Sequence, residues 1–591
     1  MLIPPSTYTH AHTHTTMSPV ISYESFLVTE SFQGFEDPEK FKKYLPKLEK
    51  YKNDLKESIL DEYKVAMPKP IDELVKDQLD AVDYMYKEKL LTPEEFEITD
   101  STASKIVKNI GDGKWTAVQV LKAFAHRGTI AHQFTNCAHQ IFVDEGIKRA
   151  EELDEYQKKT GKLVGPLHGV PVSLKEHFNY AGKVTHSGYV SLIDNLTEEF
   201  GVTPQILHDL GAVFYIRTTQ PQTLMHLCSE SNYSDLTKCP FNISLSSGGS
   251  SAGEGAVVTF GGSVFGIGSD IGGSIRSPAA FSGCFGLRPT THRVSMEGST
   301  SSLGGQETIQ AVFGPLARTV EDIDTMMRTY LNEGKPWNFD ASLICMPWRE
   351  VPKPSAKDLT IAVIRDDGLV RPSPPIRRGI NTVVEKLKEA GVKIIEFTPP
   401  NTKLAYETIN KMYNCDGNET NRKMLGESGE PLVPLTKWSL NYGDGSRMFT
   451  VPEVRQLHMT RDALRNEYNK FMVDNNVDFI LSPAYNNVAP HPREVFNWSY
   501  TALFNILDLP TLVLQTGLKQ DPAVDVWTEE DKKHQYRSQL EQLENEMYKP
   551  EEFKHAPIAL QLSGRRYHDE EVVAAGKVIA DDILKVNLLK H

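Results

Sequence analysis

The sequence of 591 residues lacks the features that mark several classes of protein. No window approaches the run of about 18 apolar residues that a membrane-spanning helix needs. The six cysteines form no CxxC pair and have no metal-ligand spacing, so we expect neither a metal site nor a disulfide framework. Basic residues are in deficit, since 64 Lys and Arg face 78 Asp and Glu, for a formal net charge of -14. This balance argues against nucleic acid as the main partner.

The first residues also lack a targeting signal. MLIPPSTYTHAHTHTT has neither the basic start nor the apolar core of a signal peptide, and no Lys or Arg precedes Lys40. His10, His12 and His14 could bind a metal weakly, but a disordered tail is the favoured interpretation of residues 1–35. Together with scattered cysteines that suit a reducing compartment, these absences predict a cytoplasmic protein.

Residues 36–98 are predicted to form a helical extension before the main domain, which covers 99–591. Apolar residues recur in this extension at three- and four-residue spacings, which is typical of an amphipathic helix. They are Phe41, Tyr44, Leu48, Tyr51, Leu55 and Ile59. The Lys and Glu residues between them suit a solvated face, so we expect the apolar stripe to pack on the main domain.

Beyond residue 99, strand and helix patterns alternate. Apolar, β-branched segments of strand length lie at 170–174, 212–216, 360–364, 393–397, 479–482, 511–515 and 558–562. Helical patterns include 103–110, 116–126, 141–160, 203–210, 377–390 and 569–588. This order predicts an α/β fold with a large mixed, mostly parallel central sheet covered by helices on both faces. Pro171 at the start of its strand suits an edge strand or a strand entry.

The stretch from Ser246 to Thr290 is unusually rich in glycine. Two clusters about twenty residues apart each end on serine, and they read Gly248-Gly249-Ser250-Ser251 and Gly272-Gly273-Ser274. Glycine occurs where the backbone adopts positive φ or approaches another group closely. Two serine-bearing turns at the ends of a buried segment would bring two hydroxyl groups together. The pattern therefore indicates a nucleophile site.

Lys175 follows the apolar strand 170–174. In α/β proteins, side chains at the carboxyl ends of buried strands often line a binding cleft. Taken alone, Lys175 would more simply be a surface lysine whose stem packs along the strand. A lysine acts as a general base only when it is neutral, and its usual pKa of about 10.4 would have to fall by roughly three units. Burial can lower the pKa that far, so Lys175 is a candidate base for the two serines.

The segments GGSSAGEGA and GSDIGGSIRSPAAFSGCFGLRPT, downstream of GPLHGVPVSLKEHF, resemble the amidase signature family. The likeness runs from Thr99 to the C-terminus and is densest between Gly165 and Thr290. Within the family, the chain looks most similar to fungal acetamidase-type enzymes, which also resemble fatty-acid amide hydrolases. It departs from the common pattern at Thr219, Ala252 and Ser269, which bears on substrate preference and not on reaction type.

The resemblance implies a role for each of several residues. Ser274 would be the acyl-forming nucleophile, Ser250 a proton shuttle in an unusual cis conformation, and Lys175 the terminal base. Backbone N–H groups would form the oxyanion hole, at Ile271, Gly272, Gly273 and Ser274. The implied substrate-binding residues are Leu224, Ser250, Ile271, Gly272, Gly273 and Ser274. For Asp270 and Arg276, which flank the nucleophile loop, a structural ion pair is favoured over a part in the chemistry.

The resemblance therefore implies an amidase without cofactor that hydrolyses a carboxylic acid amide to the carboxylate and ammonia or an amine. The reaction would pass through a Ser-Ser-Lys triad and an acyl-enzyme. Small aliphatic or aryl amides are the expected substrates, and the family suggests a homodimer. Two alternatives stay within the family: a long-chain fatty-acid amide hydrolase, and the amidase subunit of a tRNA-dependent amidotransferase.

A further alternative belongs to another class of enzyme. The segment 249–253 matches GxSxG, the nucleophile elbow of α/β-hydrolases, with Ser251 as the nucleophile of an esterase. That mechanism needs a downstream histidine, and His458, His491 and His568 are available by order. The elbow leaves the second serine cluster and Lys175 unexplained, which makes this alternative weaker.

Overall fold

The structure of the protein is a computed structural model, and it describes residues 36–441 and 447–590. Its centre is an 11-stranded sheet. In spatial order the strands are β1 (Ala138–Ile141), β5 (Val213–Thr218), β2 (Pro171–Lys175), β8 (Phe265–Asp270), β10 (Val312–Ala317), β9 (Phe285–Arg288), β14 (Thr511–Lys519), β15 (Pro557–Gly564), β13 (Phe479–Pro483), β11 (Thr360–Val363) and β12 (Lys393–Glu396). The predicted tail at 1–35 lies outside the described residues.

The sheet is mixed, as predicted. Parallel pairing occurs in two groups, where β2 lies between β5 and β8, and where β11 lies between β12 and β13. All other neighbours in the sheet are antiparallel, so parallel pairing predominates only within those two groups. The parallel group at β2 matters for function, because it brings the ends of β2 and β8 to one edge of the sheet.

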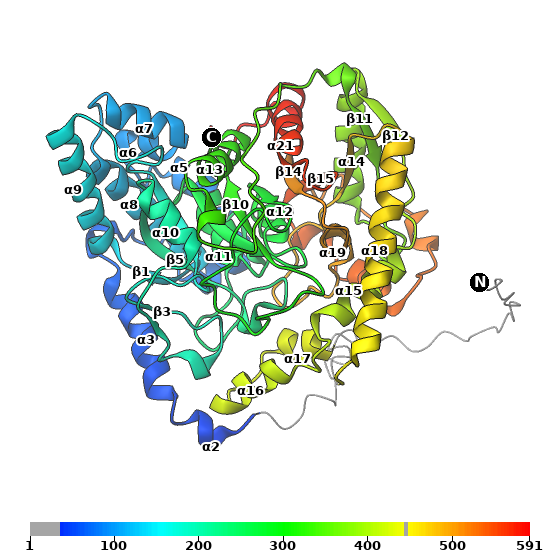
Figure 1. The fold of residues 1–591 in the computed structure, drawn as a ribbon, viewed down its shortest axis with the longest axis horizontal. Helices are drawn as coiled ribbons and strands as arrows, with labels where there is room; N and C mark the ends of the chain where they lie inside the picture. Colours follow the sequence, from blue (N-terminus) through cyan, green and yellow to red (C-terminus); the bar gives the residue numbers. More distant parts are fainter. Residues whose placement is uncertain (1–35, 442–446, 591) are drawn as a thin grey trace, which may run out of the picture.

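Helices cover both faces of this sheet. Every residue of β2, β5, β8 and β10 is buried, and successive residues of a strand point to opposite faces. Towards the β1 end of the sheet, on the left of Figure 1, lie α7 (Ala103–Gly111), α8 (Ala117–Thr135), α9 (Val143–Thr160) and α10 (Val202–Asp209). Towards the β12 end, on the right, lie α14 (Pro374–Glu389), α18 (Val451–Asp474) and α21 (Asp569–Lys577). Between them lie α11 (Ala252–Phe260), α12 (Arg276–Ser282), α13 (Val320–Asn332) and α19 (Ser499–Leu507).

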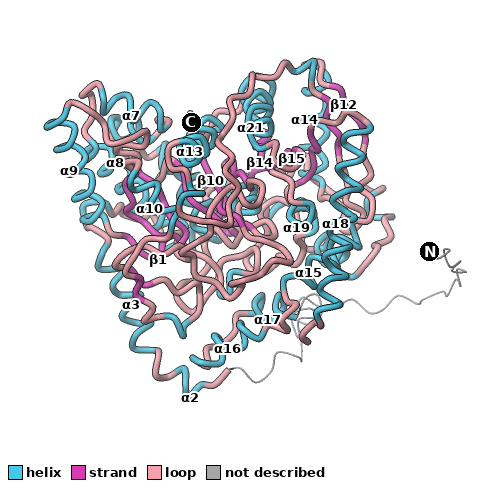
Figure 2. Tube along the Cα trace, viewed as in Figure 1, coloured by secondary structure: helices cyan, strands magenta, loops and turns pink. Residues whose placement is uncertain are grey.

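The lower part of the molecule in Figure 2 is built mainly from loops and short helices. The helices there include α15 (Thr402–Tyr413), α16 (Glu419–Ser428) and α17 (Pro434–Asn441). Elsewhere, α20 (Gln539–Glu546) precedes β15, and a π-helical turn at Val578–Leu584 continues α21. Among the described residues, none of the helices combines the length and apolarity needed to cross a membrane.

The residues before the main domain are helical, as predicted. The segment contains α2 (Pro38–Phe41), α3 (Leu45–Ser58), α4 (Ile71–Lys76), α5 (Ala81–Lys87) and α6 (Pro93–Thr99). The apolar stripe of α3 packs on the main domain, where Leu48 joins a buried cluster with Val190, Ile193 and Tyr233. Tyr51 contacts the Tyr233 ring edge to face, with centroids 5.1 Å apart. Whether this segment is a separate domain stays a prediction.

The structure corrects two local predictions. The helix predicted at 141–160 begins at Val143, because Ala138–Ile141 forms the edge strand β1. Pro171 begins its strand, as one alternative held, but β2 is interior and pairs with β5 and β8. An interior strand tolerates this proline because it is the first residue of β2. The buried segment between the serine clusters consists of α11 followed by β8.

Candidate active site

Lys175 is the last residue of β2, and its ammonium group is buried beside two serines. Its Nζ atom lies 2.6 Å from Ser250 Oγ and 3.0 Å from Ser269 Oγ, within hydrogen-bonding distance of both. Burial lowers the pKa of Lys175 to about 7, although the charges of Asp270 and Glu254 act in the opposite direction. A substantial fraction of this lysine is therefore neutral near neutral pH, as a general base must be.

The residue before Ser250 in its turn, Gly249, has no room for a side chain. A Cβ on Gly249 would lie 2.6 Å from both the Cys228 nitrogen and the His226 carbonyl oxygen, and such backbone atoms cannot give way. The Gly249–Ser250 peptide bond is cis, in agreement with the conformation that the family resemblance implies. The Ser250 hydroxyl lies against Lys175 in a nearly closed environment, with 2% of the residue exposed.

Ser274 lies in the loop that joins β8 to α12, and a buried ion pair fixes this loop. Asp270 accepts hydrogen bonds from the backbone N–H groups of Gly273 at 2.9 Å and Ile275 at 3.1 Å. Arg276 Nη2 lies 3.0 Å from Asp270 Oδ1, which confirms the predicted structural pair. Burial alone would raise the pKa of Asp270, but the Arg276 guanidinium holds it well below its usual range. The carboxylate therefore stays charged and the loop stays anchored.

Two side chains from distant segments hold the carbonyl groups of the same loop. Tyr413 Oη donates to the Ile271 carbonyl oxygen at 3.0 Å, and Thr501 Oγ1 donates to that of Gly272 at 2.7 Å. In a trans peptide the C=O and the following N–H point in opposite directions. Holding the Ile271 carbonyl therefore turns the Gly272 N–H towards the opposite side of the loop.

The amides predicted for the oxyanion hole differ in availability. The Gly273 N–H already donates to Asp270, so it would have to be shared with a substrate oxygen. Within the part of the chain that the structure describes, the N–H groups of Ile271, Gly272 and Ser274 donate to no protein acceptor. Gly273 has φ +130°, and a Cβ there would lie 2.3 Å from Thr501 Oγ1, so this position requires glycine.

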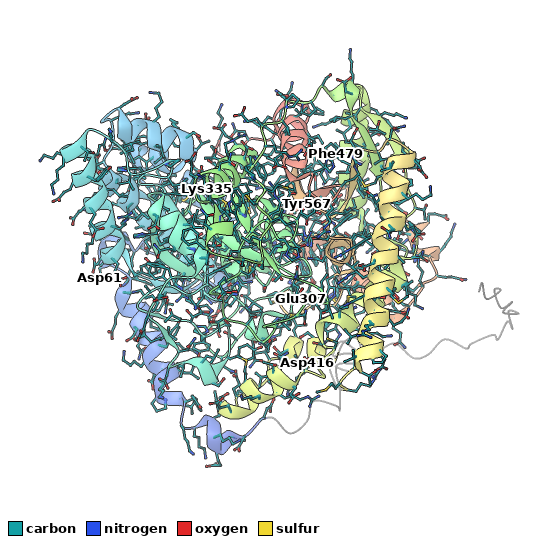
Figure 3. The ribbon with its side chains drawn as sticks, viewed as in Figure 1. Asp61, Glu307, Lys335, Asp416, Phe479 and Tyr567 are labelled. Atoms are coloured by element: carbon teal, nitrogen blue, oxygen red, sulfur yellow. The ribbon has the colours of Figure 1, made fainter. Side chains whose placement is uncertain are left out.

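Two cavities meet at Ser274. The larger, which we call the polar cavity, has a volume of about 580 Å³ and reaches the surface at Gly304, Gly305 and Glu307. Figure 3 labels Glu307 near the middle of the face shown. Its wall includes His177, Ser250, Ser269, Ser274, Val294, Met296, Glu297, Ser299, Ser301, Gln306, Gln310 and Asp340. The predicted serines therefore open into one space.

The smaller cavity, which we call the apolar pocket, has a volume of about 20 Å³. It is lined by Leu224, Met225, Leu227, Ile271, Gly272, Ser274, Tyr413 and Trp498. Leu224, Met225, Ile271 and Ser274 also line the polar cavity, so they form the boundary between the two spaces. A substrate at Ser274 can thus extend into a polar space on one side and an apolar space on the other.

Glu254 is buried on α11, behind Lys175. Its carboxylate accepts hydrogen bonds from the hydroxyl groups of Ser173 and Thr218. Burial raises the pKa of Glu254 to about 7, although these hydrogen bonds favour the charged form. The charge of Glu254 acts on Lys175 and favours its protonated form.

The geometry does not support Ser251 as a nucleophile. Its Oγ accepts from the Ser269 N–H at 3.1 Å and donates to the Ser269 carbonyl at 3.3 Å. The hydroxyl is therefore engaged with the β8 backbone. The three downstream histidines lie elsewhere, since His491 contacts Glu552, His568 contacts Glu571 and His458 lies on α18.

Comparison with known proteins shows the family of this chain. The family model described as Amidase matches residues 119–573. The chain belongs to the amidase family. A putative amidase of Schizosaccharomyces pombe is 41% identical over 488 residues, which are 82% of this chain and 90% of that protein. An acetamidase of Emericella nidulans is 35% identical over 544 residues, or 90% of this chain and 96% of that protein. The protein is accordingly an amide-hydrolysing enzyme.

Solved structures of amidases share the fold. One titled "Fatty acid amide hydrolase" is 62% identical, with a TM-score of 0.95, and the match covers 96% of this chain and all of that one. A bacterial aryl acylamidase of the amidase signature family is 18% identical, with a TM-score of 0.65 over 83% of this chain and 97% of that one. At that identity the second match shows the fold alone.

Several residues of this amidase site were not singled out from the sequence. Tyr413 and Thr501 hold the Ser274 loop, and Asn505 donates to Asp270 at 2.8 Å. They come from α15 and α19, more than 140 residues from their partners, and their positions in the sequence do not show which groups they contact. Ser269 stood out only as a departure from the family pattern, although its hydroxyl contacts Lys175.

Proposed function

We propose that the enzyme hydrolyses fatty-acid amides through Ser274, Ser250 and Lys175. The observation that carries the triad is the 2.6 Å distance between Lys175 Nζ and Ser250 Oγ, at a lysine whose pKa is lowered to about 7 by burial. Ser250 and Ser274 open into the same cavity. A neutral amine, a bridging hydroxyl and a second hydroxyl in one site supply the base, the relay and the nucleophile of acyl transfer.

In the proposed reaction, neutral Lys175 accepts the proton of Ser250, and Ser250 accepts that of Ser274. Ser274 Oγ then bonds to the amide carbonyl carbon, and the carbonyl oxygen becomes an oxyanion. When the C–N bond breaks, the proton returns through Ser250 to the departing amine. Water next attacks the Ser274 ester, giving the carboxylate and restoring the serine.

The oxyanion would be bound by backbone amides of the nucleophile loop. The Ile271 and Gly272 N–H groups suit this role, because neither is used within the described protein. Gly273, included in the predicted set, would contribute only by sharing its hydrogen bond to Asp270. Fixed amides stabilise developing charge without reorganising, and a single such donor contributes about 100- to 1,000-fold to the rate.

The polarity of the two cavities favours one orientation of the substrate. We assign the acyl chain to the apolar pocket beside Leu224, Leu227 and Trp498, and the amine to the polar cavity. An apolar chain gains free energy by leaving water for such a pocket. The 62% identity to the structure titled fatty acid amide hydrolase supports a long acyl chain.

A second candidate, hydrolysis of small amides, is favoured by the volume of the apolar pocket. About 20 Å³ holds a group the size of a methyl, and a longer chain would require its apolar side chains to move. The likeness to fungal acetamidases points the same way. Small aliphatic or aryl amides were the expectation from sequence, and we keep them as the alternative.

The deciding experiment measures ammonia release from primary amides whose acyl chains range from two to about eighteen carbons. We expect kcat/KM to rise with chain length, and Ser274→Ala to abolish hydrolysis. Ser251→Ala is the matched control, since it also removes a hydroxyl from a glycine-rich turn. Activity confined to acetamide-sized substrates would favour the second candidate. Activity that survives Ser274→Ala but not Ser251→Ala would overturn the triad.

The role of amidase subunit in a tRNA-dependent amidotransferase is a weaker proposal. Hydrolysis by the purified chain alone would argue against it. A cytoplasmic location and a homodimer remain predictions that rest on the sequence.

A further inference from the structure

Tyr413 belongs to two parts of the site at once. Its side chain lines the apolar pocket, and its hydroxyl donates to the Ile271 carbonyl oxygen at 3.0 Å. Burial raises the pKa of Tyr413 well above its usual value, so the hydroxyl keeps its proton and remains a donor. A group bound in the apolar pocket therefore packs against the residue that orients the Gly272 N–H.

The hydroxyl of Tyr413 also lies close to the backbone of the Ser274 loop. A Cβ on Gly272 would lie 2.5 Å from Tyr413 Oη, so a side chain at this position would push the tyrosine away. Tyr413 is 3% exposed and is the last residue of α15, whereas Gly272 follows β8. The glycine thus allows a residue of a distant helix to reach the loop, and a shift of the tyrosine ring would reach the loop backbone directly.

The wall of the apolar pocket has a tethered part and a flexible part. In the tethered part, Trp498 Nε1 donates to Asn410 Oδ1 at 2.9 Å, and the Trp498 ring meets that of Tyr413 edge to face with centroids 6.3 Å apart. Asn410 and Tyr413 both belong to α15, which packs beside α19 (Figure 1). The flexible part consists of apolar side chains, which are those of Leu224, Met225 and Leu227.

A long acyl chain must enlarge this pocket, because about 20 Å³ holds only a methyl-sized group. The flexible side chains can change rotamer without losing a hydrogen bond. Moving Tyr413 or Trp498 would break a buried hydrogen bond and leave its polar atoms without partners, which costs free energy. The chain should therefore displace the flexible part and pack against the two tethered rings. Such packing restricts Tyr413 to the position in which it holds the Ile271 carbonyl.

We propose that Tyr413 is a positioning residue that couples the acyl chain in the apolar pocket to the oxyanion-binding amide of Gly272. The proposal rests on the proposed function and deepens it, since it explains how a long acyl chain speeds the chemical step in addition to binding. An interaction that strengthens only in the transition state raises kcat, whereas one made equally with the bound substrate lowers KM. The coupling therefore predicts a kcat that depends on chain length.

The test measures kcat and KM separately for acetamide, octanamide and hexadecanamide. We expect the wild-type kcat to be at least about fivefold higher for hexadecanamide than for acetamide, the lower end of typical coupling between two sites. Tyr413→Phe keeps the ring against which the chain packs and deletes only the hydroxyl. It should lower kcat for hexadecanamide by about tenfold and for acetamide by much less, with little change in either KM.

Thr501→Val is the matched control. Thr501 holds a carbonyl of the same loop, that of Gly272, but it is part of neither cavity wall. Its loss should therefore lower kcat by one common factor for all three amides. Because each comparison is a ratio between substrates measured on one preparation, a partial loss of folded enzyme does not change it.

Two outcomes would overturn the coupling while the proposed function stands, with hydrolysis still abolished by Ser274→Ala. One is a Tyr413→Phe variant whose kcat falls by the same factor for all three amides, as in Thr501→Val. The other is a wild-type kcat that does not depend on chain length, so that the chain acts on KM alone. Hydrolysis that persists in Ser274→Ala would instead refute the proposed function, and the inference on Tyr413 with it.

Discussion

The amine of Lys175 and the hydroxyl of Ser250 lie 2.6 Å apart in a region closed to solvent. They come from different elements, since Lys175 ends β2 and Ser250 lies in the turn before α11. Burial lowers the pKa of the lysine, and the short contact places its amine directly beside the serine hydroxyl. The pH dependence of the enzyme should therefore report on this one contact.

We predict that kcat/KM rises with pH through a midpoint near 7. The base must be neutral, so activity is lost below the Lys175 pKa of about 7 and is full above it. Lys175→Ala should lower kcat/KM by about 100- to 10,000-fold. The check is a pH–rate profile between pH 5.5 and 9.5. An activity that does not change between pH 6 and 8 would contradict the assignment of Lys175 as the base.

Glu254→Gln should move that midpoint to lower pH. The charged form of Glu254 stabilises protonated Lys175, so removing the charge makes the lysine easier to deprotonate. Gln keeps the size, and its carbonyl oxygen can still accept from one of the two hydroxyl groups of Ser173 and Thr218 while its NH2 group donates to the other. Glu297→Gln is the control, because it removes a carboxylate from the polar cavity that does not act on Lys175. A midpoint that moves equally in both variants, or in neither, would show that Glu254 has no special role.

Local patterns predicted the parts of the site that are contiguous in sequence. Lys175 ends a strand and the two glycine–serine turns flank a buried segment, as predicted, because strand periodicity and backbone freedom are encoded within a few residues. The catalytic roles of these residues stay predictions. The edge strand β1 was missed, since four residues before a strong helical pattern carry little signal of their own. Its place is fixed by pairing with β5, which lies more than seventy residues later.

Long-range contacts account for what the sequence could not predict. Tyr413 and Thr501 lie 142 and 229 residues from the carbonyl groups that they hold. A tyrosine or threonine on a buried helix is ordinary in composition, and only packing shows which carbonyl it reaches.

Removing one of these anchors should slow the chemical step and spare binding. Tyr413→Phe and Thr501→Val each delete a hydroxyl that holds a loop carbonyl, which loosens the amides expected to bind the oxyanion. We expect kcat to fall about tenfold, less than for outright loss of a donor, with a smaller change in KM. Steady-state kinetics of both variants would check this.

The matched control for these variants is Tyr468→Phe. Tyr468 Oη donates to the Pro400 carbonyl at 2.9 Å, on α18 and outside the site. It loses the same kind of hydrogen bond, so its effect on stability should be similar while kcat is unchanged. If all three variants lose kcat to the same extent, the loss reflects general destabilisation and the anchoring role is wrong.

Arg276→Met should destabilise the fold strongly. The guanidinium of Arg276 pairs with Asp270 and also donates to the Thr501 carbonyl at 2.8 Å and to Gln561 at 3.2 Å, all without solvent exposure. Without it, Asp270 is left as a buried charge with no compensating cation at that distance. We expect the free energy of unfolding to fall by about 3–5 kcal/mol, measured by denaturant titration.

The control for the Arg276 variant is Lys50→Ala, which breaks an exposed pair with Asp54 at 2.7 Å on α3. That pair is solvated and screened, so its loss should cost less than about 1 kcal/mol. The contrast matters because both are ion pairs of similar length. If the two variants destabilised the protein equally, burial would not be what makes the Asp270–Arg276 pair important, and the anchoring of the Ser274 loop would need another explanation.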